Sequence, residues 1–455
     1  MSIESKNPFN NEVVKSFSPE PEELIKQKIN NAHNTYKKWR VTSFEERAEL
    51  MRKAGAILEE DKEKYAGLMT MEMGKPKREA IAEIEKCALC CNYYADNAEN
   101  FLANKSLNVP EGKGYIAFDP MGIVLAVMPW NFPFWQVFRF AAPNLMAGNV
   151  GLLKHASNVP QCALAIQEVF NKAGFASGAF QSLIISSDKV NMILDDERVV
   201  AATLTGSEFA GSKVAERAGR NLKKTVLELG GSDAFIVMED ADLKNAAKTG
   251  VKARMINTGQ SCIAAKRFIL HKNIADDFLE IFKQEIENLK IGDPEDDSID
   301  YGPMAREDLV DEIEEQVNKS VEMGAKVILG GKRIDRKGAF YEPTIITKVQ
   351  PGMPAYEEEL FGPVAVILIA ESSADAIRLA NDSRFGLGGS LWSQDIDTAE
   401  KQVRQIQSGA VYINQMMASH PSVPFGGIKM SGYGRELSDL GIKEFVNQKT
   451  VWISE

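Results

Sequence analysis

The chain has 455 residues, 44% of them hydrophobic and 26% charged, and its formal net charge is −11 at pH 7. This length exceeds what one hydrophobic core usually organises, so we expect at least two domains. The acidic balance argues against partners that need clustered basic residues, such as nucleic acid or an anionic membrane, and favours chemistry on a small molecule.

The N-terminus and the cysteines favour a reducing, cytoplasmic setting. Residues 1–6 lack the basic and apolar regions of a secretory signal, and the most apolar run, 123–138, is broken by two prolines. Five cysteines and only four histidines show no zinc-like spacing, so we expect neither a disulfide framework nor a metal site. The one CxxC, at Cys87 and Cys90, follows a helical stretch and is interpreted as core.

Residues 20–105 are predicted to be mainly helical. Helix starts are indicated at Pro21 and at Ser43, where Glu46 completes the spacing of a capping box. The segment 106–118 predicts a β-hairpin that is poorly suited to a core and better placed as an arm between subunits.

From residue 122 onward, short apolar runs alternate with helical stretches. The first series of runs is at 123–128, 150–153, 182–186, 201–205 and 234–238, with helices near 159–173 and 208–219. After a helix that Asp240 or Asp242 can cap, the alternation resumes at 267–270, 326–329, 364–370, 390–392 and 410–413. Such alternation predicts an α/β fold with two doubly wound parallel-sheet domains.

The predicted boundary between these domains lies near Gly230. One domain would comprise residues 1–105 and 119–229, and the other residues 230–430. The hairpin at 106–118 and residues 431–455 would form a small β oligomerisation arm and a C-terminal strand.

Cys262 and Glu228 are the candidate catalytic pair. A thiolate can attack a carbonyl carbon and form a thioester, and a carboxylate can then draw a proton from the water that releases the acid. Gly259 permits a tight backbone path just ahead of Cys262. A lone cysteine or glutamate is more often structural, so the surrounding segments carry the signal.

A dinucleotide site is indicated only weakly by local pattern, because the GxGxxG fingerprint is absent. Thr205-Gly206-Ser207 follows a predicted strand and opens the helix that contains Gly211, and helix N-termini hold phosphate well. The same residues also fit an ordinary strand-to-helix turn with a serine cap.

Several segments together resemble the aldehyde dehydrogenase family over essentially the full length, and are closest in kind to the short bacterial succinate-semialdehyde dehydrogenases. They are Pro129-Trp130-Asn131-Phe132-Pro133, Lys154, Gly206-Ser207, Glu228 to Ser232, Asn257 to Cys262, Glu359-Leu360-Phe361-Gly362-Pro363 and Pro424 to Gly427.

The resemblance implies the catalytic roles. Cys262 would be the nucleophile, its backbone N–H and the Asn131 amide would form the oxyanion hole, and Glu228 would activate water after oxidation to the thioester. Alternatively, Asn131 could be a turn residue before Pro133, and Glu228 could be a solvated carboxylate at the end of a strand.

The resemblance also implies a Rossmann-like cofactor domain and a cofactor set. Glu359 and Phe361 would meet the nicotinamide riboside, Lys154 and Ser157 the adenosine ribose. The remaining members of the set are Trp130, Gly206, Ser207 and Gly211. A glutamate at position 157 would repel a 2′-phosphate; serine does not, so we predict NADP, with NAD as the alternative cofactor.

The substrate prediction rests on Trp135 and Arg139, which are four residues apart and share one helical face. An arginine in the aldehyde channel is costly unless it meets an anion, and the carboxylate of succinate semialdehyde would supply one. The alternative for Arg139 is an ion pair with a glutamate elsewhere in the fold or at a subunit contact. Ser261 and Ser419 are candidate secondary contacts to the same carboxylate.

Rival functions are a dehydrogenase for another aldehyde, a CoA-acylating aldehyde dehydrogenase, and a structural protein that has lost activity; the presence of Glu228 favours hydrolysis. The only partners expected are the aldehyde and further copies of the chain, as a homodimer or homotetramer. No second cysteine lies at 260–264, so no neighbouring-disulfide switch is inferred.

Overall fold

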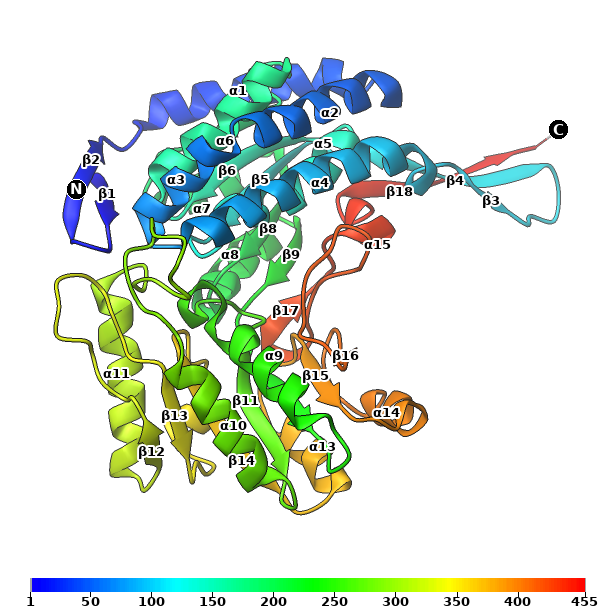
Figure 1. Cartoon of the computed structure of the whole chain (residues 1–455). Helices are drawn as coiled ribbons and strands as arrows, with labels where there is room; N and C mark the ends of the chain where they lie inside the picture. Colours follow the sequence, from blue (N-terminus) through cyan, green and yellow to red (C-terminus); the bar gives the residue numbers. More distant parts are fainter. Residues whose placement is uncertain (1, 455) are drawn as a thin grey trace.

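The structure, a computed structural model, describes residues 2–454 and has an α/β fold built on two large, mostly parallel sheets (Figure 1). The strands of the first sheet are parallel, except for β17, which comes last in the sequence and is antiparallel to β9. Its order is β17 (Gly432–Tyr433), β9 (Lys224–Glu228), β8 (Val199–Thr205), β5 (Ile123–Met128), β6 (Val150–His155) and β7 (Phe180–Ser182).

Helices cover both faces of this sheet, which explains why its central strands are apolar along their length. Every residue of β6 is buried, and so is every residue of β5 except Val127. The helices are α1 (Glu22–Trp39), α2 (Phe44–Glu60), α3 (Lys62–Met73), α4 (Lys77–Phe101), α5 (Trp135–Met146), α6 (Pro160–Ala173), α7 (Val190–Asp195) and α8 (Glu208–Arg220), with the short 3-10 turn η1 (Ser187–Lys189).

The second sheet has seven strands and is parallel except where β12 meets β13. Its order is β12 (Lys326–Leu329), β13 (Thr344–Thr347), β14 (Val364–Ala370), β11 (Ala265–His271), β10 (Asp233–Val237), β15 (Gly389–Trp392) and β16 (Tyr412–Ile413). The accompanying helices are α9 (Leu243–Met255), η2 (Ile256–Gly259), α10 (Ala275–Glu287), α11 (Glu307–Glu322), α12 (Pro354–Glu357), α13 (Ser373–Asn381), α14 (Ile396–Val403), η3 (Lys429–Ser431) and α15 (Ser438–Ile442).

Alternate side chains of the second sheet pack into two separate hydrophobic cores, one on each face. Ala234 and Ile236 of β10 belong to the cluster on one face, whereas Phe235 and Val237 belong to the cluster on the other. This is the period-two alternation expected of a strand with helices on both sides. The first sheet and its helices form a third, larger core.

Two small antiparallel sheets complete the fold. The β1 (Ile3–Asn7) and β2 (Glu12–Phe17) hairpin lies at the N-terminal end. The hairpin of β3 (Lys105–Leu107) and β4 (Lys113–Pro120) pairs with β18 (Val446–Ile453), and Figure 1 shows this three-stranded sheet extending away from the body. The hairpin predicted at 106–118 is therefore confirmed.

Most predicted elements occur where the sequence pattern indicated. The capping box of Ser43 and Glu46 is present, Asp242 caps α9, and the CxxC cysteines are buried in α4. No helix among residues 2–454 is long and apolar enough to span a membrane.

Two expectations were wrong in detail. The strand predicted at 182–186 is β7, which ends at Ser182 because this edge strand pairs with β6 only from Gly151 to Leu153. Residues 432–433, assigned to the arm, form β17 at the edge of the first large sheet, beside β9.

Candidate functional site

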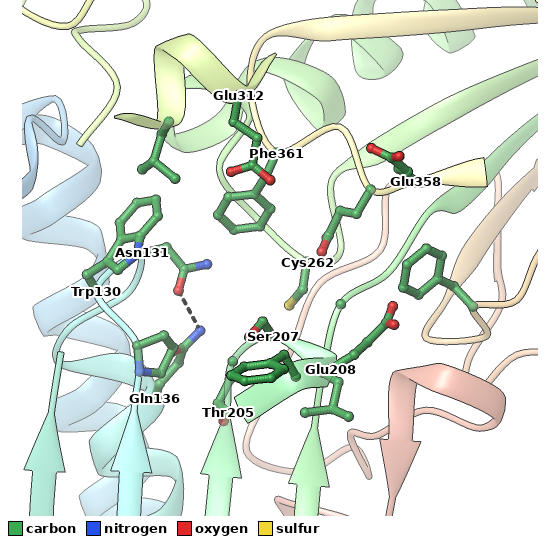
Figure 2. A pocket seen from close by; sticks show the side chains of 18 of the residues that line it. Trp130, Asn131, Gln136, Thr205, Ser207, Glu208, Cys262, Glu312, Glu358 and Phe361 are labelled. Carbon is green, nitrogen blue, oxygen red and sulfur yellow. Dashed lines mark hydrogen bonds between the residues drawn. The ribbon is translucent and has the colours of Figure 1, made fainter. Parts of the chain in front are cut away.

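A pocket of about 680 Å³ lies where the carboxyl ends of β5 and β8 meet the second sheet. This is where open α/β sheets usually bind ligands. It is lined by Trp130 and Asn131 after β5, by Thr205 to Phe209 after β8, and by Cys262, Glu359 and Phe361 from the other part of the chain. Figure 2 shows the side chains of Cys262, Asn131 and Phe361 pointing into this one cavity.

The segment before Cys262 follows an uncommon backbone path. Asn257, Thr258 and Gly259 all have positive φ, at 52°, 56° and 75°. A Cβ on Gly259 would lie 2.3 Å from the carbonyl oxygen of Gly362, so no larger residue fits there. This tight turn confirms the prediction made for Gly259, and it leaves Cys262 partly exposed at the pocket.

Lys266 holds the loop that carries Cys262. Its Nζ donates to the carbonyl oxygens of Ser261 and Cys262, each at 2.7 Å, and lies 3.1 Å from a carboxylate oxygen of Glu359. Glu359 also accepts from the backbone N–H of Gly231 at 3.1 Å. Sequence reasoning missed Lys266, although a lysine within the fully buried strand β11 is a signal that could have identified it.

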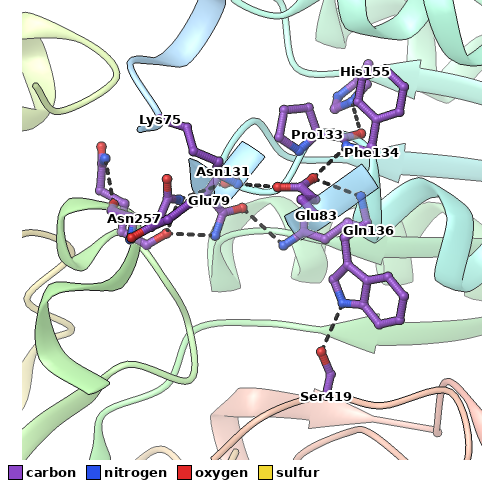
Figure 3. Close-up of polar contacts among 12 residues, drawn as sticks. Lys75, Glu79, Glu83, Asn131, Pro133, Phe134, Gln136, His155, Asn257 and Ser419 are labelled. Carbon is purple, nitrogen blue, oxygen red and sulfur yellow. Dashed lines mark hydrogen bonds and ion pairs between the residues drawn. The ribbon is translucent and has the colours of Figure 1, made fainter. Parts of the chain in front are cut away.

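The Asn131 amide is fixed from both ends. Its Nδ2 donates to the carbonyl oxygen of Gln260 at 3.1 Å, and its Oδ1 accepts from Gln136 Nε2 at 3.0 Å. The backbone oxygen of Asn131 accepts from Asn257 Nδ2 at 2.7 Å, so the loop after β5 is tied to the loop of Cys262 (Figure 3). Gln136, which also lines the pocket, was not found from the sequence.

Beneath this network, α4 supports the start of α5. Glu83 accepts from the backbone N–H groups of Phe134 and Trp135, each at 2.9 Å, and forms a buried ion pair with Lys75. Glu79 accepts from the backbone N–H of Asn257 at 2.8 Å. These contacts set the loops of Asn131 and Cys262 on one rigid helix (Figure 3).

The Cys262 thiol is not activated by its surroundings in the free protein. Desolvation raises its pKa to about 12, although the positive charges of Arg139 and Lys266 act to lower it. At neutral pH the group is therefore a thiol, and it becomes a strong nucleophile only when it loses its proton.

Glu228 ends β9 and is 2% exposed, but it does not line the pocket. Within residues 2–454, neither of its carboxyl oxygens has a hydrogen-bond partner, and a Cβ on Gly426 would lie 2.7 Å from Oε1. Burial raises the pKa of Glu228 well above its ordinary value, and the nearby charge of Glu436 raises it further, so the carboxyl is held in its neutral form.

The residues predicted for the nicotinamide end lie together at the pocket. The rings of Trp130 and Phe361 meet edge to face, with centroids 5.7 Å apart. Ser207 caps α8 by accepting from the N–H of Ala210 at 3.3 Å, and the N–H of Gly206 donates to the carbonyl oxygen of Glu228 at 3.0 Å. Gly211 packs against Leu229, and a Cβ there would lie 2.6 Å from a methyl carbon of Leu229, so the leucine side chain would have to move. A serine-capped turn is thus present, and it opens a helix N-terminus to the pocket.

A second pocket, of about 660 Å³, adjoins the first, since Phe209 lines both. Its lining contains four basic side chains, Lys154, Lys213, Arg217 and Arg220, and two acidic ones, Asp188 and Glu216; of the four cations, Lys154 alone forms no ion pair among residues 2–454. Lys154 also lines a smaller pocket of about 300 Å³ with Ser157. Two adjoining pockets with a helix N-terminus at one and cations at the other fit the shape and charge of a phosphorylated dinucleotide.

The predicted substrate residues lie next to the pocket rather than among its lining residues. Trp135 and Ser419 are joined by a hydrogen bond of 2.9 Å from the indole nitrogen, and Ser261 is 1% exposed. Arg139 is 2% exposed and forms an ion pair with Glu436, with Nη2 also donating to Thr205 Oγ1 at 3.0 Å. An ion pair with a distant glutamate was the alternative interpretation of Arg139.

Comparison with known proteins agrees with this geometry. A model of the aldehyde dehydrogenase family matches residues 1–451. The chain is 50% identical, over 454 residues and the full length of both proteins, to a probable succinate-semialdehyde dehydrogenase NADP(+) of Synechocystis sp.. It is 49% identical over 457 residues to succinate-semialdehyde dehydrogenase NADP(+) 1 of Mycobacterium tuberculosis, again over the full length of both.

Two solved structures are also similar to this chain. The crystal structure of succinic semialdehyde dehydrogenase from Streptococcus pyogenes in complex with NADP+ superposes with a TM-score of 0.98 at 40% identity, and each chain is covered completely. The structure of Gox0499 superposes with a TM-score of 0.99 at 45% identity, also with complete coverage of both chains.

Proposed function

Because the chain belongs to the aldehyde dehydrogenase family, we propose that it oxidises succinate semialdehyde to succinate with NADP as cofactor and NAD as the alternative. The observation that carries this proposal is a partly exposed Cys262 in a pocket shared with the anchored amide of Asn131, in a chain half identical to relatives named for that activity. The protein is accordingly an oxidoreductase.

Cys262 and Asn131 carry out the first half of the reaction. The Cys262 thiol gives up its proton to solvent, and the thiolate attacks the aldehyde carbon to form the thiohemiacetal, so that negative charge develops on the aldehyde oxygen. The Asn131 amide donates to that oxygen together with the backbone N–H of Cys262. A preorganised donor of this kind typically contributes about 3–4 kcal/mol.

The cofactor is held by residues of the two adjoining pockets. Trp130, Glu359 and Phe361 surround its nicotinamide end, and the turn of Gly206 and Ser207, with Gly211 in the helix behind it, receives the phosphates. Lys154 and Ser157 take the adenosine ribose and its 2′-phosphate. When bound, NADP accepts the two electrons and the hydrogen that leave the substrate carbon, which yields a thioester on Cys262.

Glu228 carries out the second half. Because its carboxyl is neutral in the free protein, Glu228 must first lose its proton; the resulting carboxylate, whose pKa is raised by burial, then takes a proton from the water that attacks the thioester. Water and thioester then give the free acid and the Cys262 thiol. Hydrolysis, rather than acyl transfer to CoA, follows from the presence of this base.

Four side chains surround the carboxylate end of the substrate: Trp135, Ser419, Arg139 and Ser261. The hydrogen bond from Trp135 places the Ser419 hydroxyl against α5, and Arg139 lies one helical turn further along the same face. Although Arg139 is paired with Glu436, its charge still acts on the surrounding site, as the effect on the pKa of Cys262 indicates.

We further propose a cytoplasmic homodimer or homotetramer joined through the arm of β3, β4 and β18. The exposed Trp452 and Ile453 on β18 support this, since apolar side chains on a projecting sheet favour pairing with another chain. We also propose a cofactor domain at 1–105 and 119–229 and a catalytic domain at 230–430, a division that the two large sheets support apart from β17, which joins the first sheet from residues 432–433.

A panel of aldehydes assayed with NAD and with NADP tests the function. We expect the highest kcat/KM for succinate semialdehyde with NADP, measured from the absorbance of the reduced nicotinamide. Activity that requires CoA, or equal turnover of an uncharged aldehyde of the same length, would contradict the proposal.

A further inference from the structure

Lys86 occupies a position on α4 that faces the start of α5. It follows Glu83 by one helical turn, and Glu83 binds the backbone N–H groups of Phe134 and Trp135. The Lys86 ammonium lies 4.1 Å from the centroid of the Trp135 ring and donates to Ser419 Oγ at 2.8 Å. One face of α4 thus presents a cation to two of the residues that surround the substrate.

The cation on Lys86 has no carboxylate partner. Among residues 2–454, no aspartate or glutamate oxygen lies within ion-pair distance of the Nζ of the half-buried Lys86, whereas the buried guanidinium of Arg139 is paired with Glu436. Desolvation lowers the pKa of Lys86 to about 8, and the more distant charge of Glu83, which acts to raise this pKa, compensates only in part. An unpaired, poorly hydrated cation is costly unless a ligand supplies the negative charge.

Ser419 offers a second donor at the same place. Its Oγ accepts hydrogen bonds from both Lys86 Nζ and Trp135 Nε1, at 2.8 Å and 2.9 Å. The lone pairs of the hydroxyl are therefore engaged, which leaves its own hydrogen to be donated to a further acceptor. An ammonium and a hydroxyl donor side by side match the two oxygens of a carboxylate.

This cluster is in electrostatic contact with the reacting sulfur through Arg139. The guanidinium charge of Arg139 acts to lower the pKa of Cys262, and the same charge acts to lower the pKa of Lys86. Trp135 is also followed directly by Gln136, whose amide contacts Asn131 in the pocket. The Lys86 ammonium is thus linked to the pocket residue Asn131 through the adjacent residues Trp135 and Gln136.

Building on the proposed function, we propose that Lys86 determines substrate specificity by pairing with the carboxylate of the semialdehyde, with Ser419 as the second donor. Lys86 supplies the counter-charge that Arg139, already paired, does not provide in full. The residue acts on binding of the acid end and takes no part in bond making at Cys262.

The test compares Lys86→Met with wild type on succinate semialdehyde and on butanal, which has the same carbon chain without the carboxylate. We expect kcat/KM for the semialdehyde to fall by about 100-fold, mainly through KM, with butanal changed by less than about threefold. Lys86→Arg should retain most of the semialdehyde activity, because it restores a cation. Lys77→Met, on the same helix but in surface ion pairs, is the matched control and should alter neither substrate.

Three results would overturn the inference. Equal loss on both substrates would assign Lys86 a structural role, and an undiminished preference for the semialdehyde in Lys86→Met would remove it from recognition while leaving the proposed function intact. A wild-type enzyme that uses butanal as well as the semialdehyde would refute the proposed substrate itself, and the inference with it.

Discussion

Lys75 and Glu83 form an ion pair that is closed off from solvent, with side-chain exposures of 0% and 3%. Glu83 uses its other oxygen to bind the backbone N–H groups at the start of α5, and the Lys75 ammonium lies 3.9 Å from the centroid of the Phe132 ring. A single buried charge pair thereby fixes the segment that carries Asn131 to the helix beneath it (Figure 3).

Loss of Lys75 should therefore destabilise the fold. Lys75→Met leaves Glu83 without a counter-charge in a buried position, which typically costs about 3–5 kcal/mol. Urea unfolding measures the change in free energy. Lys62→Met breaks a pair with Glu85 at the surface and should cost less than about 1 kcal/mol. Similar losses in the two variants would contradict the role assigned to the buried pair.

Loss of the Asn131 amide should slow formation of the thioester. Asn131→Ala removes one donor to the developing oxyanion, and we expect kcat to fall by about 100- to 1000-fold. Rapid-mixing measurement of the first turnover isolates this step. Asn171→Ala, at an exposed position of α6, is the control. An unchanged first-turnover rate in Asn131→Ala would exclude the amide from the oxyanion site.

A carboxylate at position 157 should change the cofactor preference. Ser157→Glu places a negative charge beside Lys154 in the smaller pocket, where it would repel a 2′-phosphate and accept from ribose hydroxyls. The ratio of kcat/KM for NADP to that for NAD should shift toward NAD. Retention of the wild-type ratio would show that the 2′-phosphate binds elsewhere.

The reactivity of Cys262 in the free enzyme should rise steeply with pH. Because desolvation raises the pKa of this thiol to about 12, the thiolate is a small fraction at neutral pH and grows about tenfold per pH unit below that value. The rate of alkylation by iodoacetamide, followed on the Cys262 peptide, should increase without levelling off between pH 7 and pH 10. The unfolded chain, with an ordinary thiol pKa of about 8.5, should level off within this range. A plateau in the folded enzyme below pH 9 would contradict the stated effect of burial.

Local sequence predicted the parts of the site that depend on short segments. The tight turn at Gly259 before Cys262 and the helix cap at Ser207 each depend on a few neighbouring residues, and both occur in the structure as expected. Helical spacing also placed Trp135 and Arg139 on one face of α5.

The remaining parts of the site depend on contacts between distant segments. Nothing near Arg139 in the sequence indicates that Glu436 would reach it, and nothing near Lys86 indicates Ser419. The strand β13, Thr344–Thr347, was missed, although β12 has the same length and was predicted. The tertiary fold decides whether a charged side chain is buried and which side chain pairs with it. A pattern of neighbouring residues in the sequence does not contain this information.

Trapping the covalent intermediate tests the central claim most directly. In a Glu228→Gln variant, Cys262 can still form the thioester but no base is present to activate water. Mixed with succinate semialdehyde and NADP, this variant should release about one equivalent of reduced cofactor, and mass spectrometry should locate a succinyl group on the Cys262 peptide. Steady turnover in Glu228→Gln, or an adduct on any other side chain, would contradict the account.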